Sequence, residues 1–257
     1  MIQQADRPRT NSATPKTRRT VIRAIFFDLD DTLVDDTISL EQCAEEAARE
    51  LAHDRGASPV DLGDAYVDAA IDFWTQLGPG SPKPAMGAIR PMMWRAALQR
   101  YGIEDEALAK RLAARFDELR IERVELFPEA VPVLTSLRVR YKMAVITNGF
   151  AETHERKIAQ LELERFFDVV VLAGELEMAK PDPAVFVHAM ELLDVGPDES
   201  IMVGDRYDRD IEGAHTAGMR AIWIRCRGEE VPHGARAPEA IIDSIAGLPG
   251  ALAAIPA

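Results

Sequence analysis

The chain of 257 residues is long enough for one large domain or two modest ones, and its hydrophobic fraction of 47% is ample for a sizeable core. A formal net charge of −13 argues against a general affinity for nucleic acid or anionic membranes, because both depend on clustered lysine and arginine. Two widely spaced cysteines, Cys43 and Cys226, indicate neither a disulfide framework nor a zinc site and favour a reducing cytoplasm.

Residues 1–20 are polar and rich in arginine and lysine, without apolar periodicity, so we expect a disordered basic extension. This segment lacks the apolar core of a signal peptide, and no apolar run elsewhere approaches the ~20 residues of a membrane span. We therefore expect a cytoplasmic protein that has neither a membrane nor a nucleic acid polymer as a partner.

Residues 21–27 form an apolar run, broken only by Arg23, that predicts a strand buried on both faces. Three carboxylates follow it at once: Asp28, Asp30 and Asp31. Side chains two positions apart in an extended segment share one side, so we expect Asp28 and Asp30 to face one ligand while Asp31 turns away. Crowded carboxylates repel one another, and a hard divalent cation, Mg²⁺ above all, relieves that repulsion. The alternatives are a solvated acidic turn and a calcium loop, but the spacing lacks the glycine and glutamate of a calcium loop.

Residues 35–124 repeat apolar positions with a helical period and carry almost no strand pattern, which predicts an inserted helical domain. Aromatic and methionine side chains at this spacing are expected to pack inside the domain, not to line a ligand site. Glycine- and proline-rich segments separate the expected helices, which are residues 39–53, 60–77, 85–101 and 105–124.

From residue 128 onward, apolar strands alternate with helices, which predicts an α/β fold with a doubly wound (Rossmann-like) parallel sheet and helices on both faces. The α/β core is expected to comprise residues 21–34 and 125–250. No element is assigned to the Ala- and Pro-rich residues after 232. The expected helices are residues 128–141, 151–161, 183–193 and 211–217. The expected later strands are residues 143–146, 169–172, 201–203 and 221–224.

Groups suited to an anion follow the strand at residues 143–146. Thr147 offers a hydroxyl, and after Asn148 comes Gly149, which lets backbone amides approach a ligand just before a helix N-terminus. The alternative is an ordinary turn, because Asn-Gly is common in turns.

Charged residues follow the next strands. Lys180 precedes Pro181 and Pro183, a rigid segment that would hold the direction of the lysine, while Asp205 ends a strand and Asp210 begins a helix. The alternatives are a solvated lysine and an aspartate that only complements the helix dipole. Because ligands bind at the carboxyl edge of such sheets, we expect all these groups to form one site.

Taken in chain order, the polar residues that follow these strands resemble the four motifs of the haloacid dehalogenase superfamily. The helical insertion after the first motif resembles the α-helical type-1 cap of that superfamily, and the similarity spans residues 21 to about 246. Within the superfamily the chain looks most similar to sugar phosphate and nucleotide phosphatases, including N-acylneuraminate-9-phosphatase and pyrimidine 5′-nucleotidases. The four segments are Asp28 to Leu33, Thr147-Asn148-Gly149, Lys180-Pro181, and Gly204-Asp205 to Asp210.

The resemblance implies a Mg²⁺-dependent phosphomonoester hydrolase. Asp28 would attack phosphorus and form an aspartyl phosphate, and Asp30 would protonate the leaving oxygen and then activate water. Asp28, the backbone carbonyl of Asp30 and Asp205 would hold Mg²⁺, while Asp210 orders the metal's water shell.

The resemblance also implies roles for the remaining motif residues. Thr147 and the Asn148-Gly149 amides would bind phosphoryl oxygens, and Lys180 would offset negative charge. The substrate would be a small phosphate ester such as a sugar phosphate or nucleotide, bound by a monomer or a homodimer. Because a cap closes over the site, specificity would lie in Arg90, Trp94 and Arg95 or just after Asp35, although the arginines would equally suit a solvated face.

Four other functions remain open. A dehalogenase uses the same nucleophile but lacks the second acid of the first motif, here Asp30. A phosphomutase keeps every core residue. A phospho-acceptor signalling domain has a similar site, but its acidic pair precedes the phosphorylated aspartate and it has no cap. A silent binding module is disfavoured because no motif residue is missing.

Overall fold

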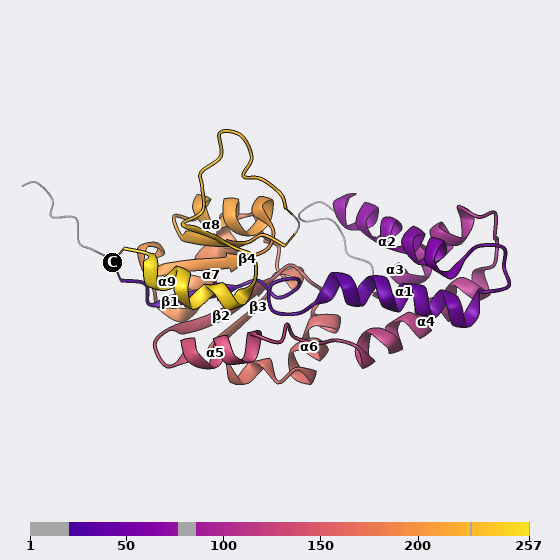
Figure 1. Cartoon of the computed structure of the whole chain (residues 1–257), viewed down its shortest axis with the longest axis horizontal. Coiled ribbons are helices and arrows are strands. Elements are labelled where there is room, and N and C mark those ends of the chain that lie inside the picture. Colours follow the sequence, from indigo (N-terminus) through magenta and orange to yellow (C-terminus); the bar gives the residue numbers. More distant parts are fainter. Residues whose placement is uncertain (1–20, 77–85, 227, 257) are drawn as a thin grey trace, which may run out of the picture.

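The computed structural model describes residues 21–76, 86–226 and 228–256, so the basic extension expected at residues 1–20 lies outside it. The molecule is elongated, with an α/β core at one end and a group of helices at the other (Figure 1). Within the described residues, no helix has both the length and the apolarity needed to cross a membrane.

The core is built on a six-stranded sheet in which neighbouring strands run parallel. The strand order β3-β2-β1-β4-β5-β6 reverses direction between β1 and β4, as in doubly wound sheets that bind ligands at this point. The predicted fold class is thus confirmed. The strands are β1 (Ala24–Phe27), β2 (Lys142–Thr147), β3 (Val169–Leu172), β4 (Ser200–Gly204), β5 (Arg220–Ile224) and β6 (Ala240–Ile242).

The register of the central strand brings three strand ends close together, although β2 runs two residues beyond the end of β1. Phe27, the last residue of β1, pairs with Val145 of β2 and with Val203 of β4. Asp28 continues the ladder, because its N–H donates to the Val203 carbonyl at 2.9 Å. The residues that follow β1, β2 and β4 therefore meet at the carboxyl edge of the sheet.

Helices cover both faces of this sheet. Ile25 and Phe27 pack with side chains of α5, α6 and α9, whereas Ala24 and Phe26 pack with α7 and α8. Alternate residues of β1 thus serve opposite faces, which explains its uninterrupted apolar run. These helices are α5 (Ala130–Arg138), α6 (Ala151–Gln160), α7 (Pro183–Leu193), α8 (Glu212–Thr216) and α9 (Leu248–Ala254).

The four helices expected between residues 35 and 124 are present and form what we call the helical domain. Its interior holds the Tyr66 ring, which stacks on Trp94 at 4.3 Å and lies 4.7 Å from Phe116. Helical spacing of apolar residues thus marked internal packing, as predicted. The helices are α1 (Asp36–Leu51), α2 (Pro59–Gln76), α3 (Met86–Gln99) and α4 (Glu106–Glu122).

The residues after 232, to which no element was assigned from sequence, contain a strand and an α-helix. They form β6, which pairs with β5, and α9, which packs on α5. β6 has three residues and is only partly buried, so its pattern is too short to recognise. In α9, Leu248 and Leu252 are buried at helical spacing.

Leu248→Ala is expected to lower the free energy of unfolding by about 2–5 kcal/mol, because it leaves a cavity beneath α9. Leu248 is fully buried, whereas the control Leu192 on α7 is 52% exposed, and Leu192→Ala should cost less than about 0.5 kcal/mol. Urea denaturation followed by circular dichroism measures both. Equally small losses would show that α9 does not belong to the cooperative core.

Candidate active site

The loop after β1 is folded tightly and separates its three acids. The N–H groups of Leu33 and Val34 both donate to the Leu29 carbonyl, at 2.9 and 3.0 Å. Asp31 adopts a left-handed backbone conformation (φ 56°), and its carboxylate accepts hydrogen bonds from the Thr37 N–H and hydroxyl. Asp31 therefore turns away toward the start of α1, as expected.

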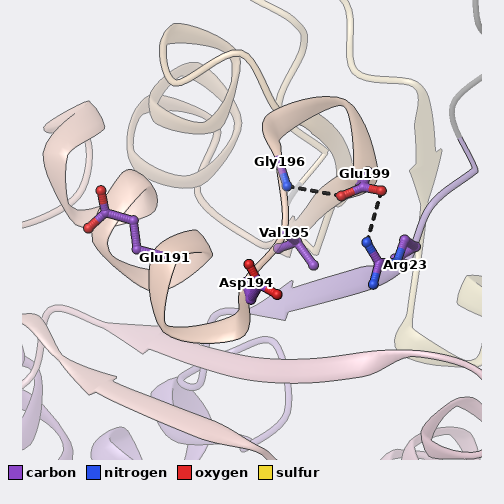
Figure 2. A pocket seen from close by; sticks show the side chains of 6 residues that line it. All are labelled: Arg23, Glu191, Asp194, Val195, Gly196 and Glu199. Atoms are coloured by element: carbon purple, nitrogen blue, oxygen red, sulfur yellow. Dashed lines mark hydrogen bonds and ion pairs between the residues drawn. The ribbon is translucent and has the colours of Figure 1, made fainter.

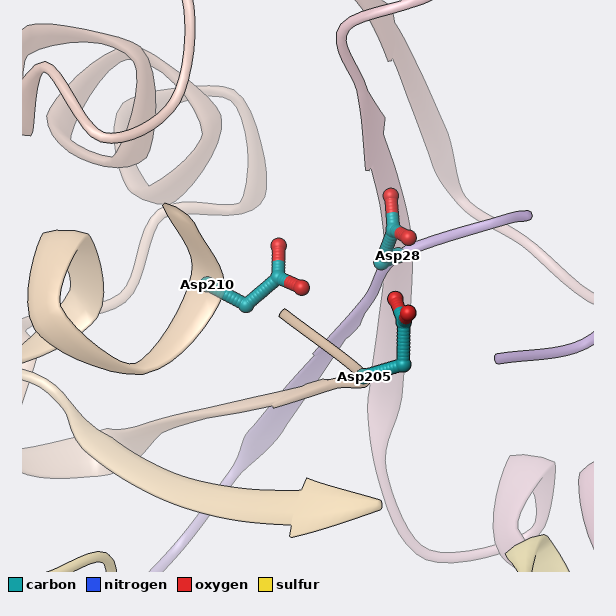
Figure 3. A group of neighbouring side chains, drawn as sticks. All are labelled: Asp28, Asp205 and Asp210. Carbon is teal, nitrogen blue, oxygen red and sulfur yellow. The ribbon is translucent and has the colours of Figure 1, made fainter. Parts of the chain in front are cut away.

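Three carboxylates converge at the carboxyl edge of the sheet. One oxygen each from Asp28, Asp205 and Asp210 lies within 4.8 Å of the others (Figure 3). The Trp223 indole N–H donates to the Asp205 carbonyl at 2.8 Å and fixes the backbone there. The sequence placed these three residues at separate strand and helix ends, and the fold brings them together.

A widened helical turn delivers Asp210 to this group. Residues Tyr207–Ile211 form one π-helical turn, a feature common at functional sites. The Arg206 N–H donates to the Asp210 carboxylate at 3.0 Å. A Cβ at Gly204 would come within 2.3 Å of that carboxylate, so only glycine fits there.

Lys180 joins two of these acids. Its ammonium donates to Asp28 at 2.6 Å and forms an ion pair with Asp210 at 2.7 Å, and the residue is only 5% exposed. The Asn148 side chain forms two hydrogen bonds with the Lys180 backbone. Its amide nitrogen donates to the Lys180 carbonyl, and its amide oxygen accepts from the Lys180 N–H. The Asn148 side chain therefore positions Lys180, a role that its motif did not suggest.

Burial and mutual repulsion raise the pKa of two acids. Desolvation, with repulsion from Asp210, raises the pKa of Asp28 to about 6 in spite of Lys180. Desolvation, then repulsion from Asp28 and Asp210, raises the pKa of Asp205 to about 9. Burial lowers the pKa of Lys180, but Asp210 and Asp28 outweigh it and raise the net value. Three acids and one lysine leave surplus negative charge among oxygen donors, which fits a hard divalent cation such as Mg²⁺.

The segment after β2 is packed closely against its neighbours. Thr147 is 2% exposed, and its hydroxyl accepts a hydrogen bond from the Gly149 N–H at 3.3 Å. A Cβ at Gly149 would overlap the His154 ring, and one at Gly174 would lie 2.0 Å from the Gly149 carbonyl. Helix α6 begins at Ala151, so this segment leads into a helix N-terminus.

Asp30 points to a different set of partners from Asp28. One carboxylate oxygen accepts from the Lys157 ammonium at 2.5 Å, and the other lies 3.0 Å from His154 Nε2. Burial opposes ionisation of Asp30, but Lys157 and His154 outweigh it and lower its pKa. Neither partner was predicted from sequence, although their spacing of three residues on α6 puts them on one helix face.

The residues suggested for specificity lie in different environments. Trp94 is fully buried among the aromatic rings of the helical domain, so packing accounts for it. Arg95 forms an ion pair with Glu106, the first residue of α4, at 3.4 Å. Arg90 forms an ion pair with Asp117 and is largely buried. Trp94 and Arg95 thus have described partners inside the helical domain, and their role in specificity stays a prediction.

Two aromatic side chains mark the boundary between the helical domain and the core. Trp74 of α2 lies with its ring 5.3 Å from that of Phe150, which directly follows Gly149. The helical domain therefore contacts the segment next to the acid cluster. The amphipathic pattern of α2 did not distinguish this contact of Trp74 from packing inside the helical domain.

A separate hollow lies at the opposite, amino edge of the sheet. There the Glu199 carboxylate accepts from the Gly196 N–H at 3.1 Å and pairs with Arg23 at 3.0 Å (Figure 2). Because ligands of doubly wound sheets bind at the carboxyl edge, the acid cluster and not this hollow is the candidate site. The other lining residues are Glu191, Asp194 and Val195.

Comparisons with known proteins show which proteins this chain is similar to. The model of the haloacid dehalogenase-like hydrolase family matches residues 22–218. N-acylneuraminate-9-phosphatase of Mus musculus is 28% identical over 240 residues, covering 91% of this chain and 95% of that protein. Phosphoserine phosphatase of Thermus thermophilus is 32% identical over 222 residues, covering 79% of this chain and 88% of that protein. A 2-haloacid dehalogenase structure from Pseudomonas syringae aligns with a TM-score of 0.63 and 31% identity, covering 91% of this chain and 99% of that one.

Asp205→Asn is expected to stabilise the metal-free protein at pH 8 by on the order of 2 kcal/mol. The pKa of Asp205 rises from 3.8 to about 9 on folding, so the folded protein holds a proton that the unfolded chain releases. Stability contributed by this group therefore falls as the pH rises from about 4 to about 9. Thermal unfolding in chelator from pH 5 to 9 measures the effect.

The matched control for this prediction is Asp208→Asn, because Asp208 lies three residues after Asp205, in the π-helical turn, and its side chain is 59% exposed. Its stability profile should follow that of the wild type. Mg²⁺ should stabilise the wild type and Asp208→Asn, but not Asp205→Asn. A wild-type stability that is flat across this pH range would contradict the prediction.

Proposed function

The chain belongs to the haloacid dehalogenase-like hydrolase family, and we propose that it is a Mg²⁺-dependent phosphatase of a small phosphorylated metabolite. The observation that carries the proposal is the group of Asp28, Asp205 and Asp210 around one lysine at the carboxyl edge of the sheet. The phosphatases among its relatives support the same activity. A sugar phosphate or a nucleotide is the substrate class that we favour.

The metal would be held by Asp28, Asp205 and the backbone carbonyl of Asp30, with Asp210 ordering its water shell. A bound Mg²⁺ supplies positive charge that neutralises the phosphate and the crowded acids. Lys180 supplies further positive charge at Asp28, and its buried ion pairs hold that carboxylate in one orientation.

In the first step, a carboxylate oxygen of Asp28 attacks phosphorus, and the bond from phosphorus to the ester oxygen breaks. Lys157 and His154 outweigh burial and favour the ionised form of Asp30 before substrate binds, so Asp30 would take up a proton from water as the anionic ester binds beside it. Asp30 then gives this proton to the ester oxygen, and the leaving group departs as a neutral alcohol. The product on the enzyme is an aspartyl phosphate at Asp28. Thr147 and the backbone amides of Asn148 and Gly149 would bind the phosphoryl oxygens, next to the start of α6.

In the second step, a water oxygen attacks the phosphorus of the aspartyl phosphate. The carboxylate of Asp30 takes a proton from this water, and the bond between phosphorus and Asp28 breaks. Inorganic phosphate leaves, Asp28 returns as a carboxylate, and Asp30 is protonated again. Helices α1–α4 would act as a cap that shields these steps from bulk water.

The second candidate is a 2-haloacid dehalogenase, which the similarity to the Pseudomonas syringae structure favours. A halide ion leaves without a proton, so that reaction has no use for an acid held in place like Asp30. The fixed position of Asp30 therefore favours the phosphatase.

Asp28→Asn is expected to reduce phosphate release by at least about 10⁴-fold, because it removes the nucleophile. The assay follows phosphate from sugar phosphates, nucleotides, phosphoserine and p-nitrophenyl phosphate, with Mg²⁺ and with chelator. Chelator should abolish release by the wild type.

Asp208→Asn provides the control, since Asp208 is exposed and pairs only with neighbouring arginines among the described residues. It should retain wild-type rates. Halide release from 2-chloropropionate without phosphate release would overturn the phosphatase in favour of the dehalogenase. Isomerised sugar phosphate without free phosphate would indicate a mutase.

A further inference from the structure

One ammonium connects Asp30, in the loop after β1, to the first helix of the helical domain. Lys157 of α6 donates to Asp30 at 2.5 Å and to Asp36 at 2.6 Å, and its side chain is 10% exposed. Asp36 is the first residue of α1. The core, the loop after β1 and the helical domain therefore meet at the buried ammonium of Lys157.

The last helix of the helical domain reaches the same point. Arg120 of α4 forms an ion pair with the Asp36 carboxylate and also donates to the Asp36 carbonyl at 3.1 Å. Its side chain is 12% exposed. The chain enters the helical domain through α1 and leaves it through α4, so this contact ties both connections together (Figure 1).

The carboxylate of Asp30 is held from two directions. Lys157 contacts one oxygen, and His154 lies 3.0 Å from the other. His154 is itself anchored, because its Nδ1 lies 3.1 Å from the Phe150 carbonyl. With both oxygens engaged, the carboxylate has one preferred orientation.

The four charges balance, since Asp30 and Asp36 oppose Lys157 and Arg120. Loss of the ammonium would leave two neighbouring carboxylates without their shared cation. Breaking one member of a buried ion group has a larger effect than breaking a surface pair, because the remaining charges stay desolvated. Asp30 would then move toward solvent.

We propose that Lys157 is a positioning residue that orients Asp30 and, through Asp36, couples that orientation to the placement of the helical domain. The inference rests on the proposed phosphatase function, in which Asp30 protonates the leaving group. A helical domain that shifts at α1 displaces Asp36, and the shared ammonium transmits that displacement to Asp30. The Lys157 ammonium forms ion pairs with Asp30 and Asp36, and among the described residues it forms none with the side chains of Asp28 or Asp205.

Esters with different leaving groups test this role. An alkyl phosphate needs a proton on its leaving oxygen, whereas p-nitrophenolate leaves readily without one. Lys157→Met should lower kcat on the best alkyl ester by about 10- to 100-fold and on p-nitrophenyl phosphate by less than about 3-fold. Lys157→Arg, which keeps the charge, should recover most of the loss.

Two more variants complete the experiment. Asp36→Asn should produce a smaller loss with the same preference for alkyl esters, because the ammonium loses its link to α1. Lys110→Met is the matched control, since Lys110 lies on the helical domain with 67% of its side chain exposed. It should follow the wild type on both esters.

Equal losses of Lys157→Met on both esters, or no loss on either, would overturn the positioning role. If that variant does not fold, Lys157→Arg and Asp36→Asn still decide the matter, and wild-type kinetics of Asp36→Asn would overturn the coupling. A wild type inactive on every ester would sink the proposed function instead. In that case, crystal structures of the wild type and Lys157→Met would still test whether Lys157 orients Asp30. An Asp30 carboxylate in the same position in both structures would contradict the inference.

Discussion

The Lys180 ammonium, buried between the carboxylates of Asp28 and Asp210, is the interaction on which the rest of the site depends. Without that charge, three acids could not share one small buried space, since Asp210 raises the pKa of Asp28, and Asp28 and Asp210 together raise the pKa of Asp205. The amide of Asn148 holds the backbone of the lysine in both directions. The site is therefore assembled around a cation that belongs to the protein.

Close packing supports this assembly. At Gly204, Gly149 and Gly174 the neighbouring atoms occupy the space that a side chain would need. The sheet register puts Asp28 level with the end of β4, and the π-helical turn then carries Asp210 over Gly204. A small error in any of these positions would separate the three carboxylates, because their oxygens converge within a few ångströms.

A second cluster of charged side chains lies beside the one around Lys180 and differs from it in its balance of charge. Lys157 and Arg120 balance Asp30 and Asp36 there, so this cluster leaves no surplus charge for a metal. The two acids of the first loop thus divide between the clusters, with Asp28 beside Lys180 and Asp30 beside Lys157. Separate surroundings give these two neighbouring carboxylates opposite pKa shifts. The pKa of Asp28 is raised because the group is desolvated, and the pKa of Asp30 is lowered because Lys157 and His154 outweigh its desolvation.

The sequence by itself determined the alternation of strands and helices, the four-helix insertion and the motif residues at the strand ends, because periodicity and spacing are local properties. Only the tertiary structure decided the partners. Asp30 meets His154 and Lys157 across 124 and 127 positions, and Asn148 reaches Lys180 across 32. Likewise, helical spacing could not tell that Trp94 faces inward and Trp74 faces Phe150. Such contacts depend on how distant elements pack, and no local pattern encodes that packing.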